Sequence, residues 1–191
     1  MTNIYYQRTE ALRQIMRAKG WDAVVIGGSD PHSSEYPAPR WKQVEWLTGF
    51  TGEAGDVVVT LDHAGLWTDT RYFIQANRQL EGTGFVLHKT RVPEQVLIPE
   101  WLACHAFALK DRCVVVALDG LCQGVSAVDD LKDAFRAAGR AEGSPDEDGF
   151  RIASVPDLME CLWENRPAIP QTPVITLGAD LVGESLSLIH I

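Results

Sequence analysis

One stretch of the sequence decides the fold class: Asp56-Val-Val-Val-Thr-Leu-Asp-His-Ala-Gly-Leu-Trp-Thr68. Two apolar runs, at 56–61 and 64–68, flank the dipeptide Asp62-His63. Two strand-forming runs separated by two turn residues are typical of a β-hairpin, in which the strands run antiparallel. The stretch therefore predicts an antiparallel pair of strands in whatever sheet this chain builds.

Further strands are predicted on both sides of the hairpin. Asp22-Ala-Val-Val-Ile-Gly-Gly28 and Cys113-Val-Val-Val-Ala-Leu118 are dominated by uninterrupted apolar residues, which is typical of strands covered on both faces. Gly84-Phe-Val-Leu-His88 is another strand candidate. A first helix is predicted before Gly20, with Leu12, Ile15 and Met16 facing the core, and further helices are predicted at 40–48, 70–80, 94–109 with an interruption at Pro99, 127–138 and 156–163. This alternation predicts an α/β domain with a mixed β-sheet flanked by helices.

Two of these helices carry capping signals. Thr2 or Asn3 is placed to cap the first helix, and Gly20 is placed to end it. Ser126 is placed to cap the helix at 127–138.

The sequence predicts one domain over residues 1–165. Within it, 140–149 is polar and acidic, so we expect a mobile surface loop there. Residues 166–185 form a linker and the start of a second domain, because 167–173 holds three prolines in seven residues and should be extended and stiff. The last six residues, 186–191, are expected to be a non-native tail, because a reading frame through a common sequencing adapter would encode them.

Composition excludes several classes of partner. Seventeen basic and 26 acidic residues give a net charge of -9, which argues against a nucleic-acid or anionic-membrane surface. There is no run of about 20 apolar residues that could form a membrane helix, and no secretion signal at the N-terminus. The four cysteines form no C-x-x-C pair. We therefore expect a cytoplasmic protein with reduced thiols.

Three blocks together resemble the N-terminal domain of the Xaa-Pro aminopeptidases of the cytosolic three-domain type. They are Asp30-Pro-His-Ser-Ser-Glu-Tyr36, Leu47-Thr-Gly-Phe-Thr-Gly-Glu-Ala-Gly55 and Leu66-Trp-Thr-Asp-Thr-Arg-Tyr-Phe-Ile-Gln-Ala76. Leu162-Trp-Glu-Asn-Arg-Pro-Ala-Ile-Pro170 resembles the junction that follows this domain. Departures from the family pattern are Thr70, Glu53 and Asp56, where Gly, a small residue and a Thr-like residue are usual.

This resemblance implies a layered domain of the creatinase/prolidase N-terminal type. It also implies a parent enzyme that hydrolyses the bond between an N-terminal residue and a following proline. In that family two divalent metals, typically manganese, are held by two Asp, one His and two Glu of a catalytic domain, so we expect no cofactor in this chain and no activity of the chain alone. The implied partners are its own missing catalytic domain, a proline-containing peptide substrate and, in the full-length enzyme, a second copy as a homodimer.

Arg71 is the candidate substrate-binding residue. It follows a predicted strand and stands at a predicted helix start, where the helix dipole favours anions rather than cations. The placement suits a guanidinium that pairs with Asp69 or with a ligand carboxylate. By resemblance, the matching residue contacts the peptide substrate. A purely structural ion pair with Asp69 remains the alternative.

The other candidates have simpler interpretations. Asp30, His32, Glu35 and Tyr36 are interpreted as a polar network that holds a loop, because an H-x-x-E pair in a loop is not a metal site. His63 stands in the predicted hairpin turn, and His88 and His105 are isolated in the sequence. None of the three is therefore interpreted as a metal ligand. Four aromatic residues are assigned to the core or a domain seam, with a proline-binding aromatic surface as the alternative: Trp41, Trp46, Trp67 and Tyr72.

Two other functions stay open from the sequence. One is a stand-alone, non-catalytic peptide- or protein-binding module of the same fold. The other is a different hydrolase of this architecture, such as a creatinase or prolidase, against which the 30–36 block and the proline-rich junction argue.

Overall fold

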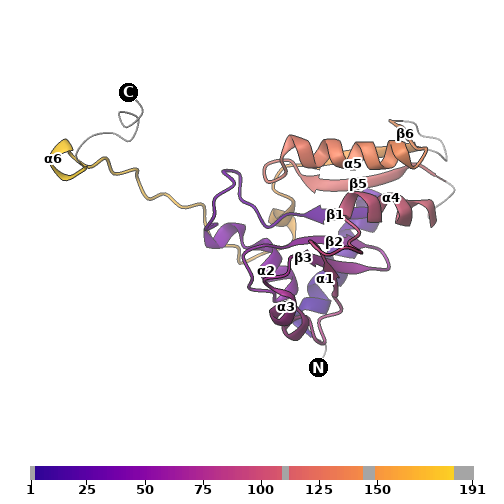
Figure 1. Ribbon diagram of the computed structural model, residues 1–191, viewed down its shortest axis with the longest axis horizontal. Coiled ribbons are helices and arrows are strands. Elements are labelled where there is room, and N and C mark those ends of the chain that lie inside the picture. Colours follow the sequence, from indigo (N-terminus) through magenta and orange to yellow (C-terminus); the bar gives the residue numbers. More distant parts are fainter. Residues whose placement is uncertain (1–2, 109–111, 144–148, 183–191) are drawn as a thin grey trace.

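The computed structural model describes residues 3–108, 112–143 and 149–182. These residues form a seven-stranded mixed sheet with the strand order β4-β3-β2-β1-β5-β7-β6, covered by helices (Figure 1). The α/β class with a mixed sheet is thus confirmed. The strands are β1 (Ala23–Ile26), β2 (Asp56–Thr60), β3 (Ala64–Thr68), β4 (Val86–Lys89), β5 (Val114–Asp119), β6 (Ala141–Glu142) and β7 (Gly149–Val155).

The hairpin forms as predicted. β2 and β3 are antiparallel, with Asp56 opposite Trp67 and Val59 opposite Ala64. β1 is antiparallel to β2 on one side and parallel to β5 on the other. The antiparallel part of the sheet, β3-β2-β1, is therefore continued by parallel pairs on both sides, with β4 beyond β3 and β5 beyond β1.

Helices cover both faces of the sheet (Figure 1). The helices are α1 (Ile4–Lys19), α2 (Gln43–Thr48), α3 (Phe73–Gln79), α4 (Ile98–Ala108), α5 (Val125–Ala137) and α6 (Ala179–Val182), with 3-10 turns η1 (Pro39–Trp41) and η2 (Leu158–Cys161). One core cluster joins strand residues to α1, α2 and α3, and a second joins them to α4 and α5.

Alternate residues of each central strand enter these two cores. Val24 and Ile26 of β1 belong to the first cluster, while Ala23 and Val25 belong to the second. Side chains of a strand alternate between its two faces, so a strand covered on both sides must be apolar throughout. This is why residues 23–26 are uninterruptedly apolar and buried.

The first helix begins and ends as the sequence predicts. The Asn3 side chain accepts a hydrogen bond from the backbone N–H of Tyr5 at 2.9 Å. Gly20 ends the helix in the left-handed region, with φ of 68°, a conformation that glycine adopts without steric cost.

Three predictions about the second half were wrong. The helix predicted at 156–163 is only the 3-10 turn η2. Helix α5 begins at Val125 with Gly124 as its N-cap, so Ser126 lies inside the helix and does not cap it. Residues 149–155 form strand β7, of which Gly149 falls in the predicted acidic loop. Phe150 of β7 is fully buried and stacks on Phe135 of α5, with ring centroids 4.9 Å apart. Residues 144–148 of that loop and the predicted tail 186–191 lie outside the described residues.

The aromatic residues divide between core and surface roles. Trp67 is 2% exposed and belongs to the second core cluster, and Trp46 and Tyr72 pack against the first. Trp41 is half-buried, and the guanidinium groups of Arg40 and Arg166 lie near its ring.

A buried carboxylate joins the starts of β1 and β5. The Asp22 side chain is 1% exposed and forms an ion pair with Arg112. It also accepts a hydrogen bond from the backbone N–H of Val115 at 2.8 Å, while the Asp22 N–H donates to the Val115 carbonyl at 2.8 Å. Asp22 therefore anchors the parallel pairing at the centre of the sheet.

Replacing Asp22 with alanine should lower the free energy of unfolding by about 1.5–3 kcal/mol, because charge-assisted hydrogen bonds are lost and the Val115 N–H is left without its partner. Urea denaturation of both proteins measures the change. Asp129→Ala, on the exposed side of α5, is the control and should stay within about 0.5 kcal/mol of the parent chain. Equal effects of the two substitutions would contradict the anchoring role of Asp22.

Candidate functional site

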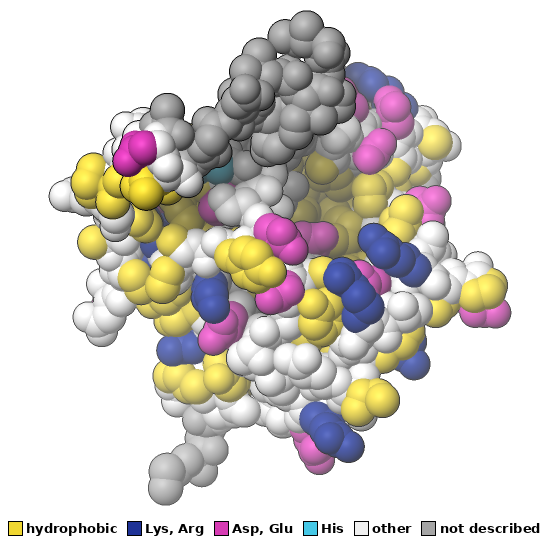
Figure 2. All heavy atoms as spheres, turned by 60° about the vertical axis from the view of Figure 1, so that its left-hand side comes forward, with side chains coloured by type: hydrophobic (Ala, Val, Ile, Leu, Met, Phe, Trp, Pro, Cys, Tyr) yellow, Lys and Arg dark blue, Asp and Glu magenta, His cyan; other side chains and the backbone are white. Residues whose placement is uncertain are grey.

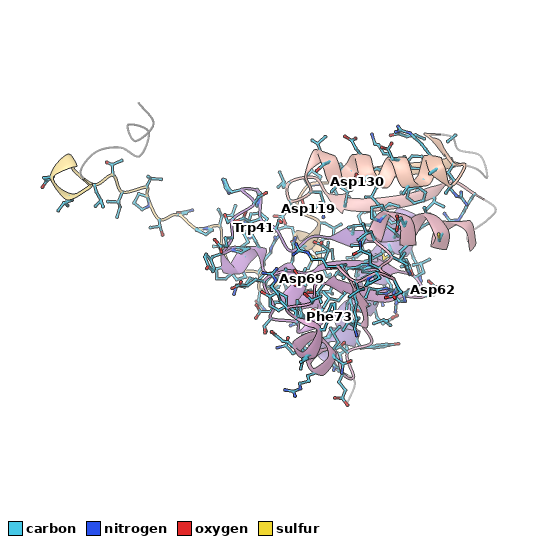
Figure 3. All side chains as sticks on the ribbon, viewed as in Figure 1. Trp41, Asp62, Asp69, Phe73, Asp119 and Asp130 are labelled. Atoms are coloured by element: carbon cyan, nitrogen blue, oxygen red, sulfur yellow. The ribbon has the colours of Figure 1, made fainter. Side chains whose placement is uncertain are left out.

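The loops that follow β1, β3 and β5 meet along one edge of the sheet. These strands run in the same direction, because β1 is parallel to β5, and both β1 and β3 are antiparallel to β2. The chain moves from β1 toward β2 on one side and from β5 toward β7 on the other. Binding sites of open α/β sheets lie outside the carboxyl ends of strands at such a point. We call this side the carboxyl edge; Figure 3 shows Asp69 and Asp119 there and Asp62 at the opposite end.

Arg71 and Asp69 form a two-pronged ion pair at the carboxyl edge. The Asp69 side chain is 6% exposed and the Arg71 side chain is 60% exposed. Arg71 Nε donates to Asp69 Oδ1 at 3.0 Å, and Nη2 donates to Oδ2 at 2.8 Å. The hydrogen bond from the Arg71 side chain lowers the pKa of Asp69 to about 2. The buried Asp69 carboxylate thus fixes one edge of the Arg71 guanidinium, while the Arg71 side chain stays mostly exposed to solvent.

Arg71 lines an open hollow of about 380 Å³ at this edge. The walls come from the loop after β1 and from the turn before β2. The lining residues are Gly28, Ser29, Ser34, Glu35, Pro37, Glu53, Ala54, Gly55, Asp56 and Arg71. Glu35 and Arg71 thus line the same hollow, although they lie 36 positions apart in the sequence and were predicted to have different roles. Figure 2, which turns this edge toward the viewer, shows acidic side chains around the middle of the face.

Two carboxylates of this hollow were not among the site residues predicted from the sequence. Asp56 accepts a hydrogen bond from the backbone N–H of Gly28 at 3.1 Å, which joins the end of β1 to the start of β2. Glu53 lies in the turn before β2 and is exposed. The signal that could have found them was their departure from the family pattern, Glu53 within the glycine-rich turn and Asp56 directly after it.

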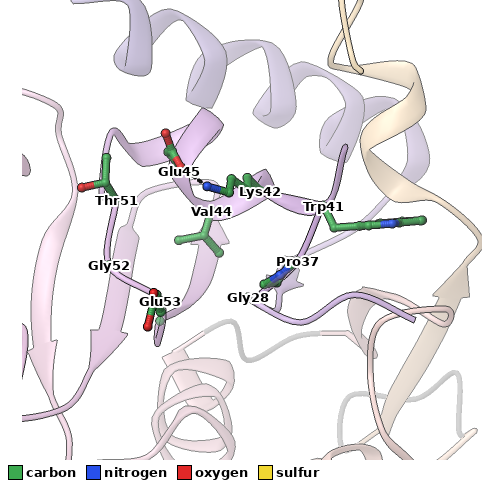
Figure 4. A pocket seen from close by; sticks show the side chains of 10 residues that line it. Gly28, Pro37, Trp41, Lys42, Val44, Glu45, Thr51, Gly52 and Glu53 are labelled. Atoms are coloured by element: carbon green, nitrogen blue, oxygen red, sulfur yellow. Dashed lines mark ion pairs between the residues drawn. The ribbon is translucent and has the colours of Figure 1, made fainter. Parts of the chain in front are cut away.

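A smaller hollow of about 70 Å³ adjoins the first (Figure 4). It shares Gly28, Pro37, Glu53 and Gly55 with the larger hollow. Its far wall is formed by η1, α2 and Lys42 between them. Lys42 Nζ lies 3.8 Å from Glu45 Oε2 in an exposed ion pair. The two hollows together make a shallow depression along the 28–37 loop.

Asp30 organises the 30–36 loop. Its side chain accepts hydrogen bonds from the backbone N–H groups of His32 and Ser34, both at 2.9 Å. Burial alone would raise the pKa of Asp30, but these hydrogen bonds outweigh it and hold the pKa below its ordinary value. The turn places Ser33 at a φ of 53°. The loop is therefore shaped through its backbone.

The remaining members of the predicted loop network point outward. His32, Glu35 and Tyr36 are exposed, and the Tyr36 side chain is 74% exposed. Of these three, Glu35 lines the hollow beside Arg71. They are therefore placed to contact something outside this loop.

His88 was predicted to be isolated, but the structure places it beside His63 of the hairpin turn. Their Nε2 atoms lie 3.0 Å apart, and the His88 ring stacks on Trp67 with centroids 3.8 Å apart. Burial, and then the neighbouring His63, lower the pKa of His88 to about 4. Within the described residues, no group of three His, Cys, Asp or Glu is placed to hold a metal ion, and the His105 side chain lies outside those residues.

The four cysteines are free thiols. Burial raises the pKa of Cys122 to about 12, so this thiol stays protonated and unreactive near neutral pH. In the part of the chain that the structure describes, no helix combines the length and the apolar character required to span a bilayer.

The fold is found in solved structures of related enzymes. The X-prolyl aminopeptidase of Caenorhabditis elegans, described as a cytosolic enzyme with a di-nuclear active site, matches with a TM-score of 0.78 and 28% identity. The match covers 96% of this chain and 29% of that one. An aminopeptidase P structure from Streptococcus thermophilus shares the fold with a TM-score of 0.58 at 18% identity, covering 84% of this chain and 98% of the other.

Curated sequences give the same relationship. "Probable Xaa-Pro aminopeptidase P" of Metarhizium acridum is 34% identical over 177 residues, which is 92% of this chain and 26% of the relative. "Xaa-Pro aminopeptidase 2" of Mus musculus is 32% identical over 179 residues, which is 93% of this chain and 24% of the relative. The chain thus spans about a quarter of the length of these relatives.

The sequence model of the Creatinase/Prolidase N-terminal domain matches residues 8–147, most of the sheet and its covering helices. With the layered mixed sheet and the similarity to Xaa-Pro aminopeptidases, this match shows that the chain belongs to the creatinase/prolidase N-terminal domain family.

Proposed function

We propose that this chain is the non-catalytic N-terminal domain of a metal-dependent Xaa-Pro aminopeptidase and that its carboxyl edge forms one wall of the peptide cleft. The observation that carries the proposal is the position of Arg71. Its guanidinium is 60% exposed, is oriented by a buried Asp69 and lines a hollow large enough for part of a peptide. The similarity to Xaa-Pro aminopeptidases over more than nine-tenths of the chain supports the same assignment.

The chemistry of the parent enzyme belongs to its catalytic domain. Two divalent metals, which we expect to be manganese, would polarise the scissile carbonyl and lower the pKa of the attacking water. The described residues of this chain do not fit such a centre, because no three potential ligands converge. The di-nuclear active site of the C. elegans relative supports the expectation of a two-metal centre in the full-length enzyme.

Arg71 serves peptide binding through its exposed part. Nε and Nη2 are engaged by Asp69, which leaves the outer side of the guanidinium to donate to a carbonyl or carboxylate oxygen of the peptide. Because Asp69 already restrains the long side chain, less conformational entropy is lost when a peptide binds. The pair with Asp69 therefore positions Arg71 as well as stabilising the turn.

The proposed partners follow from this role. They are the catalytic domain of the same protein, a proline-containing peptide, and a second copy in a homodimer of the full-length enzyme. The net charge of -9 favours these over nucleic acid or anionic membranes. The proposed location is the cytoplasm, which the cytosolic C. elegans relative supports.

A second candidate function is peptide or protein binding without catalysis. Tyr36 and Ile74 are 74% and 73% exposed, and both lie in segments that follow strands ending at the carboxyl edge. Exposed apolar and aromatic side chains are typical of recognition surfaces. Activity of the full-length protein on Xaa-Pro peptides separates the two functions.

In the full-length enzyme, Arg71→Ala should lower kcat/KM for an Xaa-Pro peptide about ten- to hundredfold. A charge-assisted hydrogen bond to the peptide is worth roughly 1.5–3 kcal/mol. Arg71→Lys should restore only part of the activity, because a point charge cannot reproduce the planar fork. Steady-state kinetics and thermal unfolding are measured on each variant, with Arg78→Ala, an exposed arginine of α3, as the matched control. A destabilised Arg71→Ala enzyme with unchanged kcat/KM would reduce Arg71 to a structural role.

The Asp69–Arg71 pair should also make stability depend on pH in a defined window. The pKa of Asp69 is about 2 in the folded chain, against an ordinary value of 3.8. The carboxylate therefore stabilises the fold fully above pH 3.8, and this contribution is lost as the pH falls through about 2. The difference in unfolding free energy between the parent chain and Asp69→Asn should be constant from pH 7 to about 5 and shrink toward about pH 2. Urea denaturation across this range measures it; a difference that does not change with pH would show that Asp69 is not held ionised by Arg71.

A further inference from the structure

Two arginines share one carboxylate where the described domain passes into the proline-rich segment. Arg40 Nη2 donates to Asp157 Oδ2 at 2.7 Å, and Arg166 Nη1 donates to Asp157 Oδ1. The Arg166 side chain is 3% exposed and that of Arg40 is 11% exposed. We call these three residues the junction clamp. Glu160 Oε2 lies 2.8 Å from Arg40 Nη2 and 3.7 Å from Arg166 Nη1, but the Glu160 side chain is 66% exposed, against 23% for Asp157.

The clamp also binds the backbone of the departing chain. Arg40 Nη1 donates to the carbonyl of Pro167 at 3.0 Å, and Arg166 Nε donates to the carbonyl of Arg40 at 3.0 Å. Arg40 comes from η1, and the residues it holds lie more than 115 positions later in the chain. The clamp therefore ties the first residues of the proline-rich segment to the N-terminal half of the domain.

Aromatic rings surround the two guanidinium groups. Trp41 lies 5.7 Å from the Arg40 guanidinium carbon and 5.1 Å from that of Arg166, measured to the ring centroid. Trp163 lies 5.9 Å from Arg166 and stacks on Trp46. Such contacts hold a planar cation in place and exclude water from it. Figure 3 shows Trp41 where the proline-rich segment leaves the domain.

The clamp is built at an energetic disadvantage, which points to a role beyond stability. Arg40 Nε and Arg166 Nη2 are buried and make no hydrogen bond to any described residue. Asp157 occupies the left-handed region, with φ of 49°, which is unfavourable for most residues and tolerated by Asp and Asn. Buried ion pairs are poor sources of stability, and their best-supported use is to select one geometry.

Beyond the clamp, the chain has no comparable attachment in the part that the structure describes. Residues 168–178 are exposed, and Val174 and Ile175 are 93% and 77% exposed. The segment runs away from the domain as an extended chain (Figure 1). Its direction is therefore set at the clamp and carried outward by the stiffness of the proline-rich sequence.

We infer that the junction clamp fixes the direction in which the chain leaves this domain, with Asp157 as its central positioning residue. Asp157 binds both arginines at once, one through each carboxylate oxygen, so its charge is the element that holds the geometry. In the full-length protein the clamp would set where the following domain lies relative to Arg71; that consequence rests on the proposed function, whereas the clamp itself does not.

The test is a distance measurement on the chain itself. Spin labels are attached through unnatural amino acids at Asp129 of α5 and at Gln171 beyond the clamp, both exposed, so that the native cysteines stay untouched. Double electron–electron resonance then gives the distribution of distances between the two labels.

Two variants test the role of the Asp157 charge. Asp157→Asn removes the charge and keeps the shape of the side chain, and Asn tolerates the left-handed conformation as Asp does. Glu160→Gln is the matched control, because it removes the exposed carboxylate that lies near both arginines and leaves the less exposed Asp157 in place.

We expect a narrow distribution for the parent chain and for Glu160→Gln, and about a twofold broader one for Asp157→Asn, as the segment becomes a flexible tether. Arg166→Gln should broaden the distance distribution similarly, which keeps the test decisive if Asp157→Asn fails to fold.

Thermal unfolding is measured in parallel. If the clamp only stabilised the fold, its loss would lower Tm and leave the distance distribution of the folded molecules narrow. A broad distribution in the parent chain, or no broadening in folded Asp157→Asn and Arg166→Gln, would overturn the inference. Neither result bears on the peptide-binding role of Arg71, which activity of the full-length enzyme tests separately.

Discussion

The parallel pairing of β1 with β5 is the constraint on which the rest of this structure depends. These two buried strands come from distant parts of the chain, with Ala23 opposite Val116. The buried carboxylate of Asp22 secures their first residues. Once they are paired, the 28–37 loop and the segment after β5 must emerge at the same edge of the sheet, and the hairpin of β2 and β3 delivers Asp69 and Arg71 to that edge too. The candidate site is therefore a consequence of sheet topology.

The chain uses its arginines in two contrasting ways. Arg71 keeps most of its guanidinium in solvent, so that a charge already oriented by Asp69 remains available to a ligand. Arg166 is almost completely buried between Asp157 and aromatic rings, so that it can bind nothing new and serves only to hold the chain. The difference lies in exposure, because both form short hydrogen bonds to a carboxylate. Burial converts the same functional group from a recognition element into a structural one.

The division of labour proposed for the full-length enzyme agrees with where polar groups gather. Carboxylates of the hollow, such as Glu35 and Glu53, line an open depression beside Arg71 and do not converge as metal ligands would. A surface of this kind can orient a peptide, whereas hydrolysis needs metals or nucleophiles held elsewhere. The proline-rich segment starts from the junction clamp. In the full-length enzyme the clamp would therefore fix the position of the catalytic domain relative to this domain, which orients the peptide.

The sequence by itself determined the features that depend on neighbours in the chain. The hairpin at 56–68, the buried runs of β1 and β5, and the caps Asn3 and Gly20 all follow from local pattern and turn chemistry. Only the tertiary structure decided that Glu35 shares a hollow with Arg71, that His63 pairs with His88, and that residues 149–155 add a strand. It also decided that one carboxylate, Asp157, would bind arginines on either side of it in the chain. These contacts join residues that are far apart in sequence, so their formation depends on the packing of the whole sheet, which no local pattern encodes.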